Sequence, residues 1–241
     1  MNHIPEISVA ILGYKSENFL YTFHQRVVDV LEKANLTYEI IIVANYIPNT
    51  GDTTPEVARD VAKISLHTKT VILEKPDNRH AMGWDARSGL NAATGDIIAF
   101  IDGDGQMPPE DILKLFYKIK NENLDICKAT RILRGDGFYR KLTSFIFNKL
   151  IRLLFPGINS KDINGKPKIF TRNAYSKLEL ESNDWFIDSE IMIKARRYNF
   201  KIGEIDTIFY KNTVCNSSIS FKTNFEFIKN LFWWRIKEFF I

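Results

Sequence analysis

The sequence predicts an α/β protein in which a mostly parallel sheet is flanked by helices. Its first half contains four short apolar runs, and amphipathic stretches of helical spacing separate them. Near-continuous apolar strands alternating with helices are typical of a parallel sheet that is covered on both faces. The length of 241 residues suits one large domain, or one domain with an appended segment.

The predicted elements of the first half alternate in type. Apolar runs predict strands at residues 7–12, 38–44, 70–73 and 96–101. Apolar residues at helical spacing predict helices at 18–34, 53–64, 84–93 and from Pro108-Pro109 to about 121. Pro55 is compatible with the second helix because it falls in the first turn.

The second half is less regular. We expect a strand at 125–130 and helices at 138–155, 188–198 and 224–241. The last of these belongs to an amphipathic C-terminal tail, residues 221–241, which is rich in aromatic and basic side chains. Trp233 and Trp234 favour a membrane interface, and nearby lysine and arginine side chains suit anionic headgroups. The tail therefore predicts docking on a membrane or a partner subunit, and packing on its own domain is the alternative.

Composition excludes several classes of protein. Hydrophobic residues at 45% and charged residues at 26% exclude wholesale disorder. Only two cysteines are present, which excludes a disulfide scaffold and indicates a reducing compartment. The net charge of +4 is not concentrated in a Lys/Arg run, so no nucleic-acid partner is expected. With neither a signal-peptide layout nor an apolar run of about 18 residues, we expect a cytoplasmic protein, or one lying on the cytoplasmic membrane face.

The segment DIIAFIDGDGQMPPED, residues 96–111, carries the strongest chemical signal. Asp102 and Asp104 follow a predicted strand, two residues apart, so both can face one ligand beyond the carboxyl end of that strand. Neighbouring carboxylates repel each other, and a hard divalent cation such as Mg²⁺ or Mn²⁺ would relieve that repulsion. Gln106 adds a neutral oxygen at the same spacing. An Asp-Gly turn without a ligand is the alternative.

Other ligand motifs do not match. A calcium EF-hand loop would need Gly and Glu where this chain has Met107 and Leu113. No G-x-G-x-x-G follows the first strand, which excludes a Rossmann fingerprint. A Walker A motif is excluded because Gly165-Lys166 is followed by Pro167 and has no Gly five residues upstream.

Several motifs in order resemble family 2 glycosyltransferases of the GT-A fold, especially the branch with dolichol-phosphate mannose synthase and bacterial polyprenyl-phosphate glycosyltransferases. The family pattern Asp-x-Asp-x-Gln followed by Pro-Pro-Glu matches residues 102–110. The glycine-containing stretch 78–96, which ends in Gly95-Asp96, and Asp188-Ser189-Glu190 also resemble family motifs. Glu17 resembles the Glu after the opening strand. The resemblance covers about residues 6 to 220.

Two regions depart from the family pattern. After the second strand, an acidic residue usually meets the nucleotide base, but this chain has Asn45, whose amide can still hydrogen-bond a base edge. Arg131 resembles the Arg of a Gly-Ser-Arg motif. The loop 162–168 (DINGKPK) replaces a sequence that often reads Asp-x-x-Ser-Gly-Phe, and it brings in Lys166 and Lys168. These cations suit anionic diphosphates or lipid phosphates.

The resemblance implies a GT-A domain over residues 1–220, with a nucleotide-sugar-binding half (1–130) and an acceptor half (131–220). It implies inverting transfer of a sugar from a nucleotide diphosphate sugar to polyprenyl phosphate. The residues it implies for this reaction are Asp102, Asp104 and Gln106 for Mg²⁺ or Mn²⁺, Glu17, Asn45 and Asp96 for the nucleoside, Arg131, Lys166 and Lys168 for phosphates, and Asp188 facing the acceptor.

Three alternatives remain at this point. With a glycan hydroxyl as the acceptor, Asp188 would serve as the general base, whereas a helix cap is its structural explanation. A nucleotide-sugar-binding protein without catalysis is compatible with the altered Asn45 region. A nucleotidyltransferase would need a Gly-rich basic loop after the first strand, for which residues 13–18 (GYKSEN) are a poor match.

Overall fold

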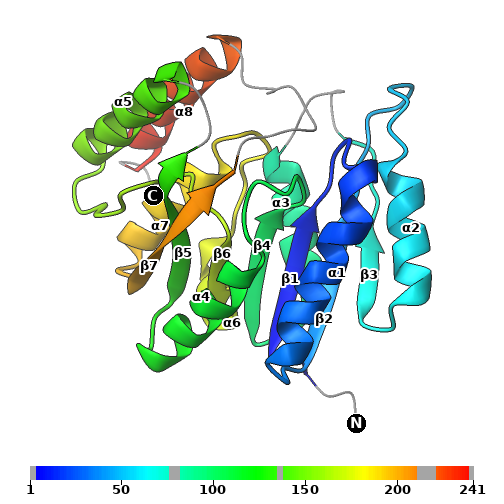
Figure 1. Cartoon of the computed structure of the whole chain (residues 1–241). Helices are drawn as coiled ribbons and strands as arrows, with labels where there is room; N and C mark the ends of the chain where they lie inside the picture. The colour runs from blue at the N-terminus through cyan, green and yellow to red at the C-terminus, as the bar shows by residue number, and fades with distance from the viewer. Residues whose placement is uncertain (1–3, 76–81, 135–137, 211–220, 239–241) are drawn as a thin grey trace.

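The computed structural model describes residues 4–75, 82–134, 138–210 and 221–238. Within these residues, seven strands form one sheet in the order β3-β2-β1-β4-β6-β5-β7 (Figure 1). The strands are β1 (Ile7–Leu12), β2 (Tyr38–Val43), β3 (Thr68–Val71), β4 (Ile97–Asp102), β5 (Ile126–Arg134), β6 (Lys168–Thr171) and β7 (Ile202–Phe209). Every neighbouring pair is parallel except those made by β6, which runs antiparallel to β4 and β5. The predicted mostly parallel α/β sheet is confirmed.

The register brings three strands to an end at the same edge. Leu12 of β1 pairs with Val43 of β2 on one side and with Asp102 of β4 on the other. Beyond them, the Gly13 N–H donates to the Val43 carbonyl, and the Gly103 N–H donates to the Leu12 carbonyl, each over 2.8 Å. The loops that leave these strands therefore start side by side at one carboxyl edge of the sheet.

Helices cover both faces of the sheet (Figure 1). They are α1 (Glu17–Lys33), α2 (Thr54–Ile64), α3 (Met82–Ala92), α4 (Glu110–Asn121), α5 (Phe138–Leu154), α6 (Arg172–Leu178), α7 (Ile187–Arg197) and α8 (Phe221–Lys237). Side chains of a strand alternate between faces. Ile7, Val9 and Ile11 accordingly join a core with α1, α2 and α4. Ala10 and Leu12 join a second core with α3 and α7, to which α5 and α8 also contribute.

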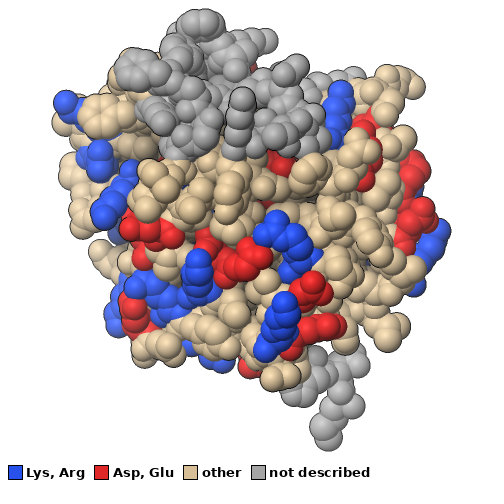
Figure 2. All heavy atoms as spheres, in the orientation of Figure 1, with Lys and Arg blue, Asp and Glu red and all other residues tan. Residues whose placement is uncertain are grey.

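The face that carries α1 and α4 has a mixed charge. Lys and Arg side chains lie among Asp and Glu side chains there, without a patch of one sign (Figure 2). Arg26 of α1 and Glu110 of α4, for example, form an ion pair of 2.9 Å.

The structure confirms the predicted strands and helices of the first half with small shifts. The largest concerns β3, which both begins and ends two residues earlier than predicted, at Thr68 and Val71. In the second half, β6, α6 and β7 were not predicted. β6 has only four residues and begins with a lysine, and β7 lies at the end of the sheet with alternate side chains partly exposed. Neither segment has the continuous apolar pattern of a central parallel strand.

The C-terminal helix α8 is amphipathic, and one of its faces packs on the domain. Leu231 and Trp234 are buried in the second core. Among the side chains of α8 that the structure describes, the exposed large apolar ones are Ile228, Phe232, Trp233 and Ile236. Packing on its own domain is thus confirmed for one face, and docking by the other face stays a prediction. Of the predicted pattern, the side chain of Phe225 and the whole of Phe239 lie outside the part of the chain that the structure describes. Within the described chain, no helix combines the length and apolarity needed to cross a bilayer.

Candidate active site

Two carboxylates meet where β4 ends. Asp102 is the last residue of β4, and Asp104 lies in the turn that follows. Gly105 has a φ of +72°, and a Cβ there would lie 2.7 Å from the Phe19 ring, so this turn requires glycine. Burial, together with the charge of Asp102, raises the pKa of the Asp104 carboxyl to about 6. The two carboxylates are therefore close enough to resist ionising together.

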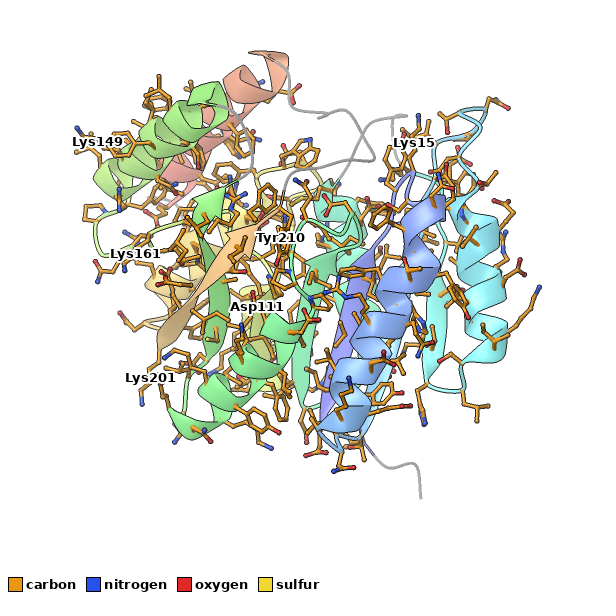
Figure 3. All side chains as sticks on the ribbon, viewed as in Figure 1. Lys15, Asp111, Lys149, Lys161, Lys201 and Tyr210 are labelled. Atoms are coloured by element: carbon orange, nitrogen blue, oxygen red, sulfur yellow. The ribbon has the colours of Figure 1, made fainter. Side chains whose placement is uncertain are left out.

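Gln106 stabilises the same turn through two hydrogen bonds. Its backbone N–H donates to Asp104 Oδ1 over 3.0 Å, and its side-chain Nε2 donates to the Tyr210 carbonyl over 3.0 Å. Tyr210, labelled in Figure 3, directly follows β7. The turn after β4 is thus tied to the segment that follows β7.

A buried cluster of opposite charges lies beside this turn. Because β6 runs antiparallel, its first residue, Lys168, pairs with Phe100 near the carboxyl end of β4. The Lys166 ammonium lies 3.1 Å from Asp102 Oδ2 and 3.3 Å from Asp188 Oδ2. Lys168 donates to Asp188 Oδ1 and, over 2.8 Å, to the Gly165 carbonyl. Asp188, near the start of α7, is only 1% exposed.

The charges in this cluster shift each other's protonation. Burial opposes ionisation of Asp188, but the Lys166 and Lys168 ammonium groups outweigh it and lower the pKa of this carboxyl. For Lys166, burial is outweighed by Asp102 and Asp188, so the pKa of the ammonium is raised. For Lys168, burial prevails and the pKa falls to about 8. Asp188 is accordingly a carboxylate with both oxygens engaged by cations.

Arg131 is engaged by Asp162. Its Nε and Nη2 donate to the two carboxylate oxygens over 2.6 and 2.8 Å, and its guanidinium carbon lies 5.2 Å from the centre of the Phe209 ring. Although burial opposes ionisation, this pairing holds the pKa of Asp162 far below its usual range. Next to it, Lys128 forms a 3.2 Å ion pair with Glu204. Arg131 and Lys128 are therefore both held in ion pairs, as Lys166 and Lys168 are.

Glu17 and Asn45 lie at the same carboxyl edge, beyond β1 and β2. Glu17 Oε2 lies 3.2 Å from Thr54 Oγ1 at the start of α2. Asn45 is buried, and its Nδ2 donates to Asp85 and Ser88, over 2.9 Å in each case. The Asn45 side-chain oxygen accepts a hydrogen bond from the Leu73 backbone N–H over 2.8 Å. Asn45 thus braces the loops at this edge.

Asp96 lies apart from the other residues. It is exposed and precedes β4, at the opposite end of the strand from Asp102. Its backbone N–H donates to the Pro5 carbonyl over 2.9 Å, and its carbonyl accepts from the Arg172 N–H over 2.8 Å. The structure thus brings together Asp102, Asp104, Gln106, Lys166, Lys168 and Asp188, but not Asp96.

Two buried ion pairs near the site were not predicted. Lys75 and Asp85 lie 2.5 Å apart, and the Lys75 ammonium is 4.4 Å from the centre of the Tyr14 ring. The second pair joins Lys128 and Glu204. Lys128 is the one case with a sequence signal, because a lysine in the middle of an apolar strand needs a buried partner.

The residues of the turn fit a divalent metal that is bound together with a phosphate. Among the residues that the structure describes, no three His, Cys, Asp or Glu side chains are placed to hold a metal by themselves. Mg²⁺ usually takes one or two carboxylates, and substrate phosphates and water complete its shell. Asp102 and Asp104 supply such a pair. Burial raises the pKa of the Asp104 carboxyl most and the charge of Asp102 raises it further, and a bound cation would favour the ionised form against both.

Comparison with protein families gives a match over most of the chain. The profile described as "Glycosyl transferase family 2" matches residues 8–179. An undecaprenyl-phosphate 4-deoxy-4-formamido-L-arabinose transferase of Pectobacterium atrosepticum is 26% identical over 223 residues, which cover 92% of this chain and 64% of that protein. A dolichol-phosphate mannosyltransferase of Pyrococcus furiosus is 29% identical over 235 residues, covering 94% and 63%. The chain therefore spans less than two thirds of the length of these relatives.

Solved structures share the fold at low sequence identity. Glucosyl-3-phosphoglycerate synthase from Mycobacterium tuberculosis in complex with Mg²⁺ and UDP aligns with a TM-score of 0.69 and 16% identity, over 96% of this chain and 79% of that chain. The same enzyme with Mn²⁺, UDP-glucose and phosphoglyceric acid gives a TM-score of 0.67 and 16% identity, over 94% and 78%. These likenesses show a GT-A fold.

Proposed function

This chain belongs to glycosyl transferase family 2 and is thus a glycosyltransferase, and from that premise we propose that it transfers a sugar, with inversion, from a nucleotide diphosphate sugar to polyprenyl phosphate. The names of the two relatives support a polyprenyl-type acceptor. The observation that carries the proposal is that both carboxylate oxygens of Asp188 are engaged by lysine side chains.

Asp188 is poorly suited to remove a proton from a hydroxyl acceptor. It is buried, both of its oxygens contact lysine ammonium groups, and its pKa is lowered. A general base works best when its pKa lies near the operating pH and when it can reach the attacking group. A phosphate acceptor needs no such base because its attacking oxygen is already an anion. The role we propose for Asp188 is therefore to hold Lys166 and Lys168 on the acceptor side.

The donor diphosphate is proposed to lie over the turn after β4. Asp102, Asp104 and Gln106 would hold Mg²⁺ or Mn²⁺ there, and the metal would neutralise charge on the leaving diphosphate. Glu17 and Asn45 belong to the nucleoside side of the same edge, Asn45 by bracing its loops. Asp96 is left out of the proposal because it lies at the other end of β4.

The chemical step needs only two bond changes. An oxygen of the acceptor phosphate attacks the anomeric carbon, and the bond from that carbon to the diphosphate breaks on the opposite face. The bonding electrons leave with the nucleoside diphosphate. Lys166 contacts both Asp102 and Asp188, so it is the first candidate to contact an incoming phosphate, and Lys168 and Arg131 are the further candidates.

A lipid acceptor also suits the surface formed by α5 and α8. The two helices lie side by side in Figure 1, and the rings of Phe147 and Phe227 join them at a centroid distance of 5.1 Å. The exposed apolar side chains of this α5–α8 surface are Leu142, Phe145, Ile146, Leu153, Ile228, Phe232, Trp233 and Ile236. Amphipathic helices of this kind lie in a membrane interface, so we propose a peripheral membrane contact here.

A transfer assay tests the function. The full chain is incubated with Mn²⁺, with UDP-, GDP- or dTDP-sugars in turn, and with either undecaprenyl phosphate or a saccharide. We expect free nucleoside diphosphate and a lipid-linked sugar with one donor and the lipid phosphate. Transfer to the saccharide alone would contradict the acceptor class, and pyrophosphate release would indicate nucleotidyl transfer instead.

A further inference from the structure

Lys166 occupies an unusual place for a lysine side chain. Its side chain is 6% exposed, and its ammonium lies between Asp102 and Asp188, at 3.1 and 3.3 Å from one oxygen of each. The same nitrogen is 3.4 Å from Met82 Sδ. Asp102 is one of the two carboxylates that fit the metal. A cation of the chain itself therefore already neutralises a carboxylate of the proposed metal site.

The backbone holds Lys166 in this place. A Cβ on Gly165 would lie 1.9 Å from the Ala129 carbonyl oxygen, so the loop lies tightly against β5. On the other side, the Pro167 carbonyl accepts from the Ala129 N–H over 3.0 Å. With both neighbours fixed against one residue of β5, the backbone of Lys166 has little freedom, and its side chain starts within reach of both carboxylates.

Asp188 gives the ammonium a second partner. A divalent cation on Asp102 would lie close to the Lys166 ammonium, and like charges repel strongly where water is largely excluded. Lys166 can turn away from Asp102 and still keep its contact with Asp188. The exchange of ammonium for metal on Asp102 therefore needs only a small movement and leaves no buried charge without a partner.

We propose that Lys166 competes with the divalent metal for Asp102, so that the metal binds weakly until an anionic diphosphate arrives to accept both cations. This inference rests on the proposed function, because it takes the metal site from it. Coupling between two ligands is reciprocal. Metal and donor therefore strengthen each other's binding, and the site is kept from filling with metal before the donor is present.

A Mn²⁺ titration without nucleotide tests the competition. Free Mn²⁺ is measured by electron paramagnetic resonance as the full chain is titrated at pH 7.5. Lys166→Met keeps the length of the stem but removes the charge, and we expect it to bind Mn²⁺ about tenfold more tightly than the wild type, within the usual range of couplings between sites. Lys161→Met is the matched control: Lys161 is exposed, lies in the adjoining loop and is labelled in Figure 3. It removes the same charge and should leave the affinity nearly unchanged.

The outcomes separate this inference from the proposed function. Equal or weaker Mn²⁺ binding by Lys166→Met overturns the competition, whatever the transfer assay shows. An equal gain in Lys161→Met also overturns it, because a general charge effect would then suffice. Loss of the bound Mn²⁺ in Asp104→Ala places the ion at this turn. Absence of Mn²⁺ binding in every variant would overturn the metal assignment too, while the transfer assay still decides the acceptor. Lys166→Gln replaces Lys166→Met if the latter does not fold.

Discussion

Asp104 is one of the two carboxylates of the proposed metal site, and its substitution by alanine removes that ligand. We expect Asp104→Ala to lose metal-dependent donor binding and to reduce transfer by ~100-fold or more, since a bound metal contributes several kcal/mol of charge stabilisation. The fold should persist because the side chain lies in a turn at the end of a strand, outside the two cores. Isothermal titration with a nucleoside diphosphate and Mn²⁺ measures the binding. Unchanged turnover, or turnover that resists a chelator, would contradict the assignment.

Asp188→Asn tests the acceptor class at a single atom. If the acceptor is a hydroxyl and Asp188 the base, transfer should fall by roughly 10²–10⁴-fold. With polyprenyl phosphate, we expect a loss of about tenfold or less, because no proton needs to be removed. The rate is measured with saturating donor and either acceptor.

The same substitution also has a stability cost. Lys166 and Lys168 lose a charged partner in a buried cluster, which typically costs about 3–5 kcal/mol. Thermal melting must therefore accompany the kinetics, with Asp206→Asn on the exposed side of β7 as the control. Near-wild-type transfer to a sugar hydroxyl by a folded Asp188→Asn protein would exclude the base role.

Glu39 lies outside the candidate active site, and its ionisation makes the free energy of unfolding depend on pH. Burial opposes its ionisation, but hydrogen bonds from Lys69, Ser8 and Thr94 outweigh it and lower the pKa of Glu39 to about 2. Because the folded pKa lies below the unfolded value of about 4.3, the stabilisation is fully present above that value and is lost as the pH falls toward 2. Glu39→Gln should be less stable by about 1–3 kcal/mol at pH 7. Urea unfolding should show the two proteins converging near pH 2, and a constant difference at all pH values would contradict the explanation.

At the scale of the element, α8 offers two neighbouring tryptophans with opposite environments. Trp233 is 61% exposed, whereas Trp234 is 7% exposed and stacks on Phe186 at a centroid distance of 6.2 Å. Trp234→Ala should lower stability by roughly 3–5 kcal/mol, as truncation of a buried aromatic does. Trp233→Ala should leave the melting temperature unchanged but weaken binding to anionic liposomes in a flotation assay. Wild-type protein that ignores such liposomes would rule out the membrane contact.

The elements that could be predicted are those whose pattern is local. β1, β2 and β4 are buried on both faces, so their apolar runs stand out. Asp102 and Asp104 could be predicted for a related reason, because they follow such a run directly.

The pairing of Lys166 with Asp102 could not be predicted from the sequence, since it depends on β6 running antiparallel beside β4. No local pattern indicates which strand a four-residue strand will pair with.

At the scale of the whole molecule, the predicted halves 1–130 and 131–220 share one sheet. β5 spans the boundary between them, and β6 from the second half separates β4 from β5. We expect a fragment of residues 1–130 not to fold stably. In this fragment β4 would lose its neighbour β6, and apolar residues of both cores would be exposed. Its circular dichroism and amide NMR dispersion should show this. A fragment that gives dispersed spectra and melts cooperatively would show that residues 1–130 fold independently.

The place of β6 also sets an order of events during synthesis. β5 is made before β6, yet it can join the first four strands only through β6. A growing chain that has released residues 1–134 from the ribosome thus carries β5 without a neighbouring strand, until about 35 further residues have followed. Translation at about 5–20 residues per second makes that interval a few seconds long. During this interval, β5 has an unpaired strand edge that a chaperone can bind. The interval ends when β6, which begins with Lys168, inserts between β4 and β5.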